Sequence, residues 1–148
     1  MRHIIFCLAF IIGALSVAGA QTPGKQSSGK LSVNVSGVRN DNGAVRCGLY
    51  ASADGFRQPG RELSGTIARP HGGQAACVFS GLPAGTYAVA VFHAEQNETQ
   101  IQYGTFGKPK QGYGFSRNPS TTFGPPSFDA ASFSYGGGNQ SVPVTLQY

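Results

Sequence analysis

The residues of this 148-residue sequence best suited to chemistry are His93 and Glu95, which follow its most apolar stretch. A histidine and a carboxylate could together transfer protons, and two residues apart on a strand their side chains point to the same side. However, no GxSxG elbow, HExxH helix, Walker loop or GxGxxG fingerprint accompanies them. We therefore expect a non-catalytic protein, and an accessory hydrolytic domain using His93 and Glu95 is the alternative.

Cysteine is the other reactive residue type, and two of the three cysteines, Cys47 and Cys77, lie on strand-like stretches. An oxidising compartment favours a disulfide between them. This disulfide would close a loop of about 30 residues and stabilise the fold by roughly 3.5 kcal/mol. Two buried free thiols, or a metal pair with His71 or His93, are the competing interpretations. We favour the disulfide because neither cysteine has CxxC spacing.

The N-terminus has the order of features of a cleavable signal peptide, which we assign to residues 1–20. Arg2 and His3 precede an apolar run over residues 4–15, and small residues at 18–20 provide a cleavage site at about Ala20/Gln21. The run is short for a bilayer span, which needs about 20 apolar residues. We expect a protein exported to the periplasm or the exterior, with no transmembrane segment; an uncleaved N-terminal anchor is the alternative.

The charge of the chain is mildly basic, with a formal net charge of +5, of which export removes only Arg2. The basic residues are scattered along the sequence, whereas nucleic-acid binding usually requires a concentrated patch. We expect no nucleic-acid partner. A weakly basic surface is instead suited to an anionic cell envelope.

Alternating apolar residues dominate the rest of the chain and predict an all-β fold. After a flexible lead-in over residues 21–29, a single domain is expected over residues 30–148. Strands are predicted at 31–36 and 45–50, joined as a hairpin by the turn at 41–43, and at 62–69, 75–79, 86–93, 131–135 and 141–148. About seven short strands without a convincing helix indicate an antiparallel β-sandwich, immunoglobulin-like or transthyretin-like.

Two local features support the sandwich. Residues 82–87 have the pattern of a tyrosine corner, in which the Tyr87 hydroxyl would bond to the backbone upstream. Pro143 lies opposite the apolar face of the last predicted strand, and proline donates no ladder hydrogen bond. The last strand is therefore expected at a sheet edge.

The segment over residues 94–129 is unusually long for a connection within a compact domain. It is rich in glycine, proline and aromatic residues, and such aromatic content is untypical of disorder. Its rings either pack over one end of the sandwich or line a ligand groove, because long ordered loops commonly carry function. The candidate binding residues at this loop are His93, Glu95, Tyr103, Phe106, Tyr113 and Phe115.

Two motifs in this loop, over residues 112–118 (GYGFSRN) and 123–128 (FGPPSF), resemble a bacterial secreted family known as domain of unknown function 2141. The resemblance covers nearly all of the mature domain. It implies an exported β-sandwich without an established activity. It also implies a calcium loop after the central strand, with oxygen ligands at positions occupied here by Glu95, Gln96, Glu98 and Gln102.

The calcium loop implied by the resemblance is degenerate in this sequence. Ala94 and Gln102 stand where the family usually has carboxylates, and calcium requires six to eight oxygens, usually several of them carboxylates. We therefore expect no cofactor. The leading hypothesis is a non-catalytic module that binds a ligand or an envelope partner through the aromatic loop, with a calcium-stabilised structural module as an alternative.

Overall fold

The computed structural model of the protein describes residues 28–148. The predicted signal peptide and residues 21–27 of the predicted lead-in lie outside the described residues. Within them the chain forms β1 (Lys30–Ser36), β2 (Ala44–Tyr50), β3 (Ser64–Ala68), β4 (Gln74–Ser80), β5 (Gly85–Ala94), the 3-10 turn η1 (Thr105–Gly107), β6 (Tyr113–Phe115), the short helix α1 (Phe128–Ala131), β7 (Phe133–Tyr135) and β8 (Gln140–Thr145).

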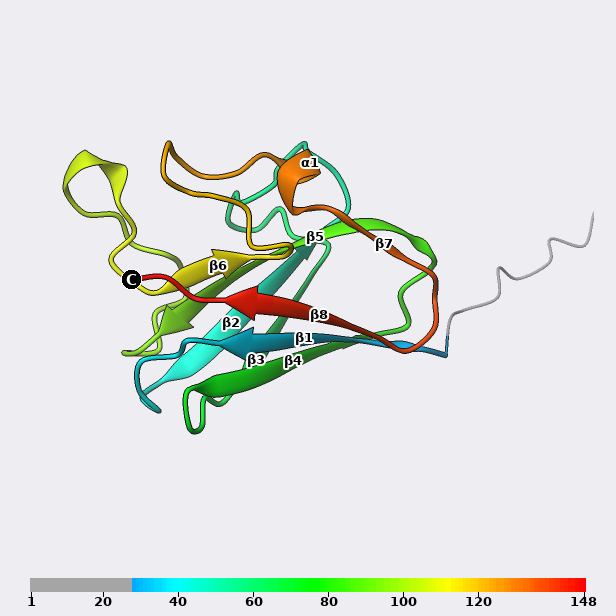
Figure 1. Cartoon of the computed structure of the whole chain (residues 1–148), viewed down its shortest axis with the longest axis horizontal. Coiled ribbons are helices and arrows are strands. Elements are labelled where there is room, and N and C mark those ends of the chain that lie inside the picture. Colours follow the sequence, from blue (N-terminus) through cyan, green and yellow to red (C-terminus); the bar gives the residue numbers. More distant parts are fainter. Residues whose placement is uncertain (1–27) are drawn as a thin grey trace, which may run out of the picture.

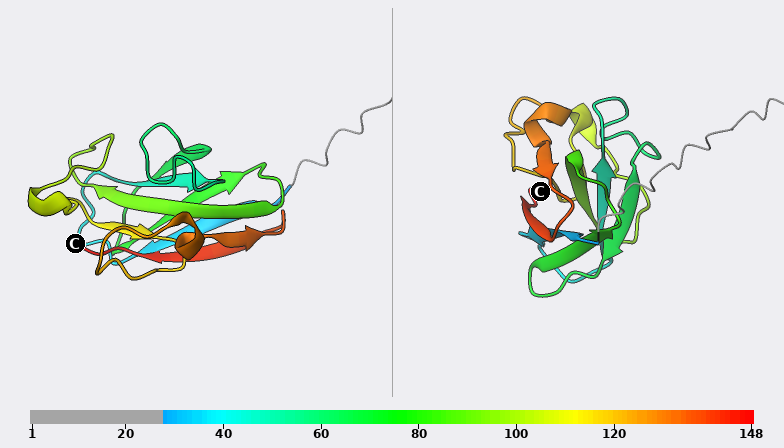
Figure 2. Two further views of the ribbon diagram at one scale, coloured as in Figure 1. Left: turned by 90° about the horizontal axis from the view of Figure 1, so that it is seen from above. Right: turned by 90° about the vertical axis from the view of Figure 1, so that its right-hand side faces the viewer.

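The strands form two sheets that lie face to face (Figures 1 and 2). One has the order β4-β1-β8, and the other has the order β3-β2-β5-β6, with β7 pairing with the first residues of β5. All pairs are antiparallel except β1 with β8. The predicted β-sandwich is thus confirmed, with one parallel pair that strand periodicity does not reveal. β8 occupies a sheet edge, as Pro143 predicted.

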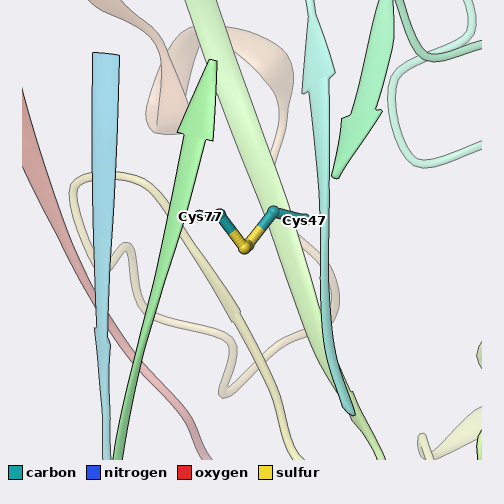
Figure 3. The surroundings of a disulfide bond; sticks show 2 residues. All are labelled: Cys47 and Cys77. Atoms are coloured by element: carbon teal, nitrogen blue, oxygen red, sulfur yellow. A yellow bond between two sulfur atoms is a disulfide. The ribbon is translucent and has the colours of Figure 1, made fainter. Parts of the chain in front are cut away.

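The core lies between the sheets and is built from alternate residues of the facing strands. Leu31, Val33 and Val35 of β1 are buried against Val45 and Leu49 of β2 and their neighbours. Within this core Cys47 of β2 and Cys77 of β4 form a disulfide that links the two sheets (Figure 3). The predicted pairing is confirmed, and it joins strands that share no ladder of hydrogen bonds.

The predicted hairpin between residues 31–36 and 45–50 is wrong. β1 pairs with β4 and β8, whereas β2 pairs with β3 and β5, so the two strands lie in different sheets. The connection over residues 37–43 is longer than a two-residue hairpin loop, and it crosses the sandwich. Gly43 ends it at a φ of 63°, where a Cβ atom would lie 1.9 Å from the Ala94 carbonyl oxygen.

β5 is central in its sheet, as its two apolar faces predicted. It begins with the predicted tyrosine corner, in which the Tyr87 hydroxyl donates a hydrogen bond to the Pro83 carbonyl at 2.9 Å. The long connection after β5 contains η1, β6 and α1, none of which was predicted. Each is three or four residues long, too short for a periodic pattern to identify. Over residues 28–148, no helix has the length and apolarity required to cross a membrane.

Candidate functional site

The outer face of the five-stranded sheet, away from the core, forms the floor of a cleft. Cross-strand partners on this face make two rows. One row contains Ile67, Arg46, Phe92 and Tyr113, and the next contains Gly65, Gly48, Ala90 and Phe115. The central residues of the second row, glycine and alanine, are small, and the ring of Tyr50 lies over Gly48 and fills part of the space above the row.

Three connecting segments rise around this floor and make the walls. They are the β2–β3 connection, the segment carrying η1, and the segment leading toward α1 (Figure 1), and both figures place them on one side of the molecule (Figure 2). The cleft that they enclose has a volume of about 1250 Å³. Its lining combines aromatic, small and cationic side chains, which suits an anionic ligand with ring-shaped or apolar parts.

Two arginines of the cleft have unusual surroundings. The Nε atoms of Arg46 and Arg57 are both buried and have no hydrogen-bond partner. The ion pairs of residues 28–148 join Arg39 with Glu95, Arg61 with Asp54 and His71 with Asp41, and so leave both arginines without a carboxylate. Arg57 has, in addition, a φ of 66°, an unfavourable conformation for a residue with a side chain. Buried unpaired donors are costly, and such groups in a native structure call for an explanation.

The charge of the cleft is positive overall. Lys108 joins the two arginines in the lining, and Glu62 is its single carboxylate within the described part of the chain. Tyr50 also lines the cleft, with its ring over Gly48: a Cβ at Gly48 would lie 3.2 Å from Tyr50 Cε2. Burial, followed by the nearby Glu62 charge, raises the pKa of the Tyr50 hydroxyl, which therefore remains protonated near neutral pH and can donate a hydrogen bond.

The rim of the cleft exposes aromatic rings. Phe106 is 98% exposed and Phe123 is fully exposed, while Tyr103 is about half-exposed. Phe106 lies at the tip of a small loop that is closed by a hydrogen bond of 2.7 Å from the Gly104 amide to the Lys108 carbonyl. Its φ of 61° is rare for a bulky residue. The loop thus presents a phenyl ring to solvent in a conformation that costs on the order of 1 kcal/mol.

The aromatic candidates predicted from the sequence come together in the cleft. The cleft is lined by all four of them: Tyr103, Phe106, Tyr113 and Phe115. A purely structural role would require all four rings to be buried, whereas Tyr103 and Phe106 are exposed. Phe115 also packs into a second cluster with Tyr50 and Phe56. The loop therefore packs with some rings and lines a cleft with others.

Sequence reasoning missed several residues of the cleft. Arg46 and Arg57 lie far from the aromatic loop in sequence, and Phe123 was recognised only as one of several recurring aromatics. The alternation in β2 did place Arg46 opposite the core-facing Val45 and Cys47. That one arginine on an otherwise small and apolar outer face was the available signal.

His93 and Glu95, by contrast, do not line the cleft. His93 is fully buried, with Nδ1 2.8 Å from the Tyr148 hydroxyl and Nε2 2.8 Å from the Asn42 carbonyl. The carbonyl can only accept, so Nε2 donates to it. With both nitrogens bonded and no access to solvent, His93 has no position for a substrate. This geometry argues against the hydrolytic alternative.

Glu95 and the other candidate calcium ligands do not fit a cation site. The Glu95 carboxylate accepts a hydrogen bond of 2.8 Å from Asn40 Nδ2 and pairs with the Arg39 guanidinium, which would repel a cation. The Asn40 hydrogen bond is the main cause of the lowered pKa of Glu95. Glu98 accepts from the Gln96 amide at 2.9 Å. Within residues 28–148 no three His, Cys, Asp or Glu side chains are close enough together to hold a metal ion.

The motif over residues 112–118 acts as a structural clamp beside the cleft. The Ser116 side chain is fully buried; its Oγ accepts a hydrogen bond of 2.9 Å from the Val89 amide and donates to the Ala131 carbonyl. The Asn118 side chain accepts a hydrogen bond of 2.8 Å from the Thr145 amide. This short motif thus joins β5, α1 and β8, and it fixes the end of the cleft formed by β6.

The fold is therefore a two-sheet β-sandwich with a cross-sheet disulfide and a cleft on its outer face. The chain belongs to a bacterial family described as an uncharacterized protein conserved in bacteria, domain of unknown function 2141, whose model matches residues 33–143. The resemblance of the loop motifs is thus confirmed over most of the domain. No curated protein and no solved structure matches the chain.

Proposed function

We propose that this protein is a non-catalytic binding module that acts outside the cytoplasm, and that the cleft on the outer face of the five-stranded sheet is its ligand site. The observation that carries the proposal is the fully exposed pair of rings, Phe106 and Phe123, at the rim of a cleft that also contains unpaired arginines. Both rings line one cleft, and exposed apolar groups that gather at one place mark a contact site, whereas single scattered ones do not. A ligand or an envelope partner provides that contact.

The other outer face of the sandwich supports this choice of site. On the sheet formed by β4, β1 and β8 the exposed outward residues include Asn34, Ser141 and Pro143, with no exposed aromatic ring among the residues of these three strands. Val78 is the large apolar side chain exposed there, at 45%. The two faces therefore differ, and the aromatic and cationic groups gather on one of them.

Export is the second part of the proposal and is supported by the N-terminal sequence and by the cross-sheet disulfide, which forms readily in an oxidising compartment. Protein recovered from the periplasm or the medium should begin at about Gln21 when its N-terminus is sequenced. Full-length protein recovered in the cytoplasm, with both thiols free, would contradict export.

The binding function is tested by retention on the organism's own cell-envelope fraction. We expect the mature chain to sediment with this fraction, and the variant Tyr103→Ala/Phe106→Ala/Phe123→Ala to remain in the supernatant. All three residues are exposed, so the variant should keep the unfolding temperature of the wild-type protein. Val78→Ala is the matched control on the opposite face and should be retained. Equal retention of the cleft variant and the wild type would contradict the proposal.

A further inference from the structure

Resting on the proposed function, we propose that the cleft binds an acidic oligosaccharide, whose carboxylates pair with Arg46 and Arg57 and whose ring faces stack on the aromatic rim. Three features of the cleft favour this ligand: two guanidinium groups without a carboxylate partner, the shape of the floor and the exposed rings of the rim.

The arginines indicate an anion. Their Nε atoms are buried without partners, although arginine remains charged at all ordinary pH values. Three cations and one carboxylate line the cleft, so its field attracts negative charge. The Nε atoms are covered, so a ligand reaches the terminal nitrogens, which are not among the buried unpaired atoms and have no carboxylate partner. A carboxylate offers two oxygens to this pair of donors.

The floor and rim indicate rings with polar edges. Aromatic faces carry negative charge density, so they attract the partially positive C–H groups on the face of a sugar ring. Phe106, Phe123 and Tyr103 present such faces, and Thr66, Gln100 and Thr122 add hydroxyl and amide groups for ligand hydroxyls. The volume of about 1250 Å³ exceeds the usual range of 300–1000 Å³ for small ligands. More than one sugar unit can therefore be accommodated.

The same floor disfavours an extended peptide, which also carries carboxylates. Peptides that bind to sheets usually add a strand at a free edge through main-chain hydrogen bonds. The cleft lies over β2 and β5, which are both paired on each side. A peptide in the cleft would leave its own amides and carbonyls largely unpaired, whereas the polar groups of a sugar lie at its ring edges and reach side chains.

The test uses the mature chain and calorimetric titration with defined probes: oligogalacturonate and alginate oligomers of six residues, the same oligomers with their carboxyl groups reduced, and hexaglutamate. We expect the uronate oligomers to bind and the reduced oligomers and hexaglutamate to bind at least tenfold more weakly. Arg46→Gln and Arg57→Gln should each weaken uronate binding by roughly 10- to 100-fold, the effect of losing a charge-assisted hydrogen bond. Arg69→Gln removes an exposed arginine outside the cleft and is the matched control.

A stability measurement distinguishes a binding role from a structural one. Because Arg46 has an unpaired buried donor, Arg46→Met should unfold at the same temperature as the wild type or higher. A variant that fails to fold would make Arg46 structural and overturn its assignment. Equal binding of reduced oligomers, or stronger binding of hexaglutamate, would overturn the ligand class. If no oligosaccharide binds but the cleft variant still loses envelope retention, the ligand class is wrong and the proposed function stands; if retention is also unaffected, both fail.

Discussion

Several single residues of this protein have roles that their type alone does not reveal. Ser116 is a small polar residue within a loop motif, yet its hydroxyl links two elements. It accepts a hydrogen bond from the Val89 amide of β5 and donates one to the Ala131 carbonyl of α1. His93 resembles a catalytic residue in sequence but is a buried connector between Tyr148 and the turn before β2. Burial and partners, rather than residue type, therefore decide which polar residues are available for binding.

Ser116 allows a direct stability prediction. Ser116→Ala should lower the free energy of unfolding by about 1–3 kcal/mol, because the Val89 amide and the Ala131 carbonyl would lose their partner inside the protein. Chemical denaturation followed by circular dichroism measures the change. Ser134→Ala, at an exposed serine of β7, is the control and should change the stability little. A Ser116→Ala protein as stable as the wild type would show that water replaces the hydroxyl.

Glu95 gives the stability a defined pH dependence. Its pKa is lowered from the ordinary value of 4.5, chiefly by the hydrogen bond from Asn40, so the ionised carboxylate is stabilised in the folded state. This contribution is present above the unfolded-state pKa and is lost as the pH falls through the lower folded-state pKa. Glu95→Gln should therefore destabilise the protein at pH 7, with a difference from wild type that shrinks as the pH falls below 4.5. A difference that is constant with pH would contradict this role.

At the scale of elements, the two sheets are joined by the disulfide and by short motifs between strands. Cys47 and Cys77 are both buried and belong to strands in different sheets. Gly114 lets β6 approach β8, because a Cβ at this position would lie 2.6 Å from the Thr145 carbonyl oxygen. These contacts fix β6, whose residues form one end of the cleft.

The disulfide should contribute substantially to stability. Cys47→Ala/Cys77→Ala should lower the free energy of unfolding by roughly 3.5 kcal/mol, the value for a closed loop of about 30 residues in the chain-entropy model. Thermal unfolding with and without reductant measures the effect. The wild-type protein should lose stability on reduction, whereas the double variant should not respond to reductant. A double variant that loses stability on reduction would show that the effect has another source.

Much of this element structure could be predicted from the sequence. Alternation in β1, β2, β4 and β5 revealed the strands and the core-facing cysteines, because one face of each strand is buried. It could not reveal which strands pair, and so a hairpin was predicted where the chain crosses between sheets. β6 and α1 were missed because elements of three or four residues are too short to show a periodic pattern.

At the scale of the whole molecule, the protein has one polar outer face and one face that carries a cleft. The aromatic half of the cleft was accessible from the sequence because Tyr103, Phe106, Tyr113 and Phe115 recur in one long loop. The cationic half was not, because Arg46 and Arg57 approach this loop only through the pairing of β2 with β5 and the course of the β2–β3 connection. A site assembled across a sheet cannot be recognised without the order of the strands.

The most direct test of the account is whether the cleft is the surface that makes contact outside the cell. Amide chemical shifts of the isotope-labelled mature chain would be followed during titration with solubilised material from its own cell envelope. We predict shifts at Arg46, Gly48 and Ala90 on the cleft floor and at Phe106 on its rim, with Asn34 and Val78 on the opposite face unchanged. Shifts confined to the sheet of β4, β1 and β8, with the cleft unchanged, would contradict the account.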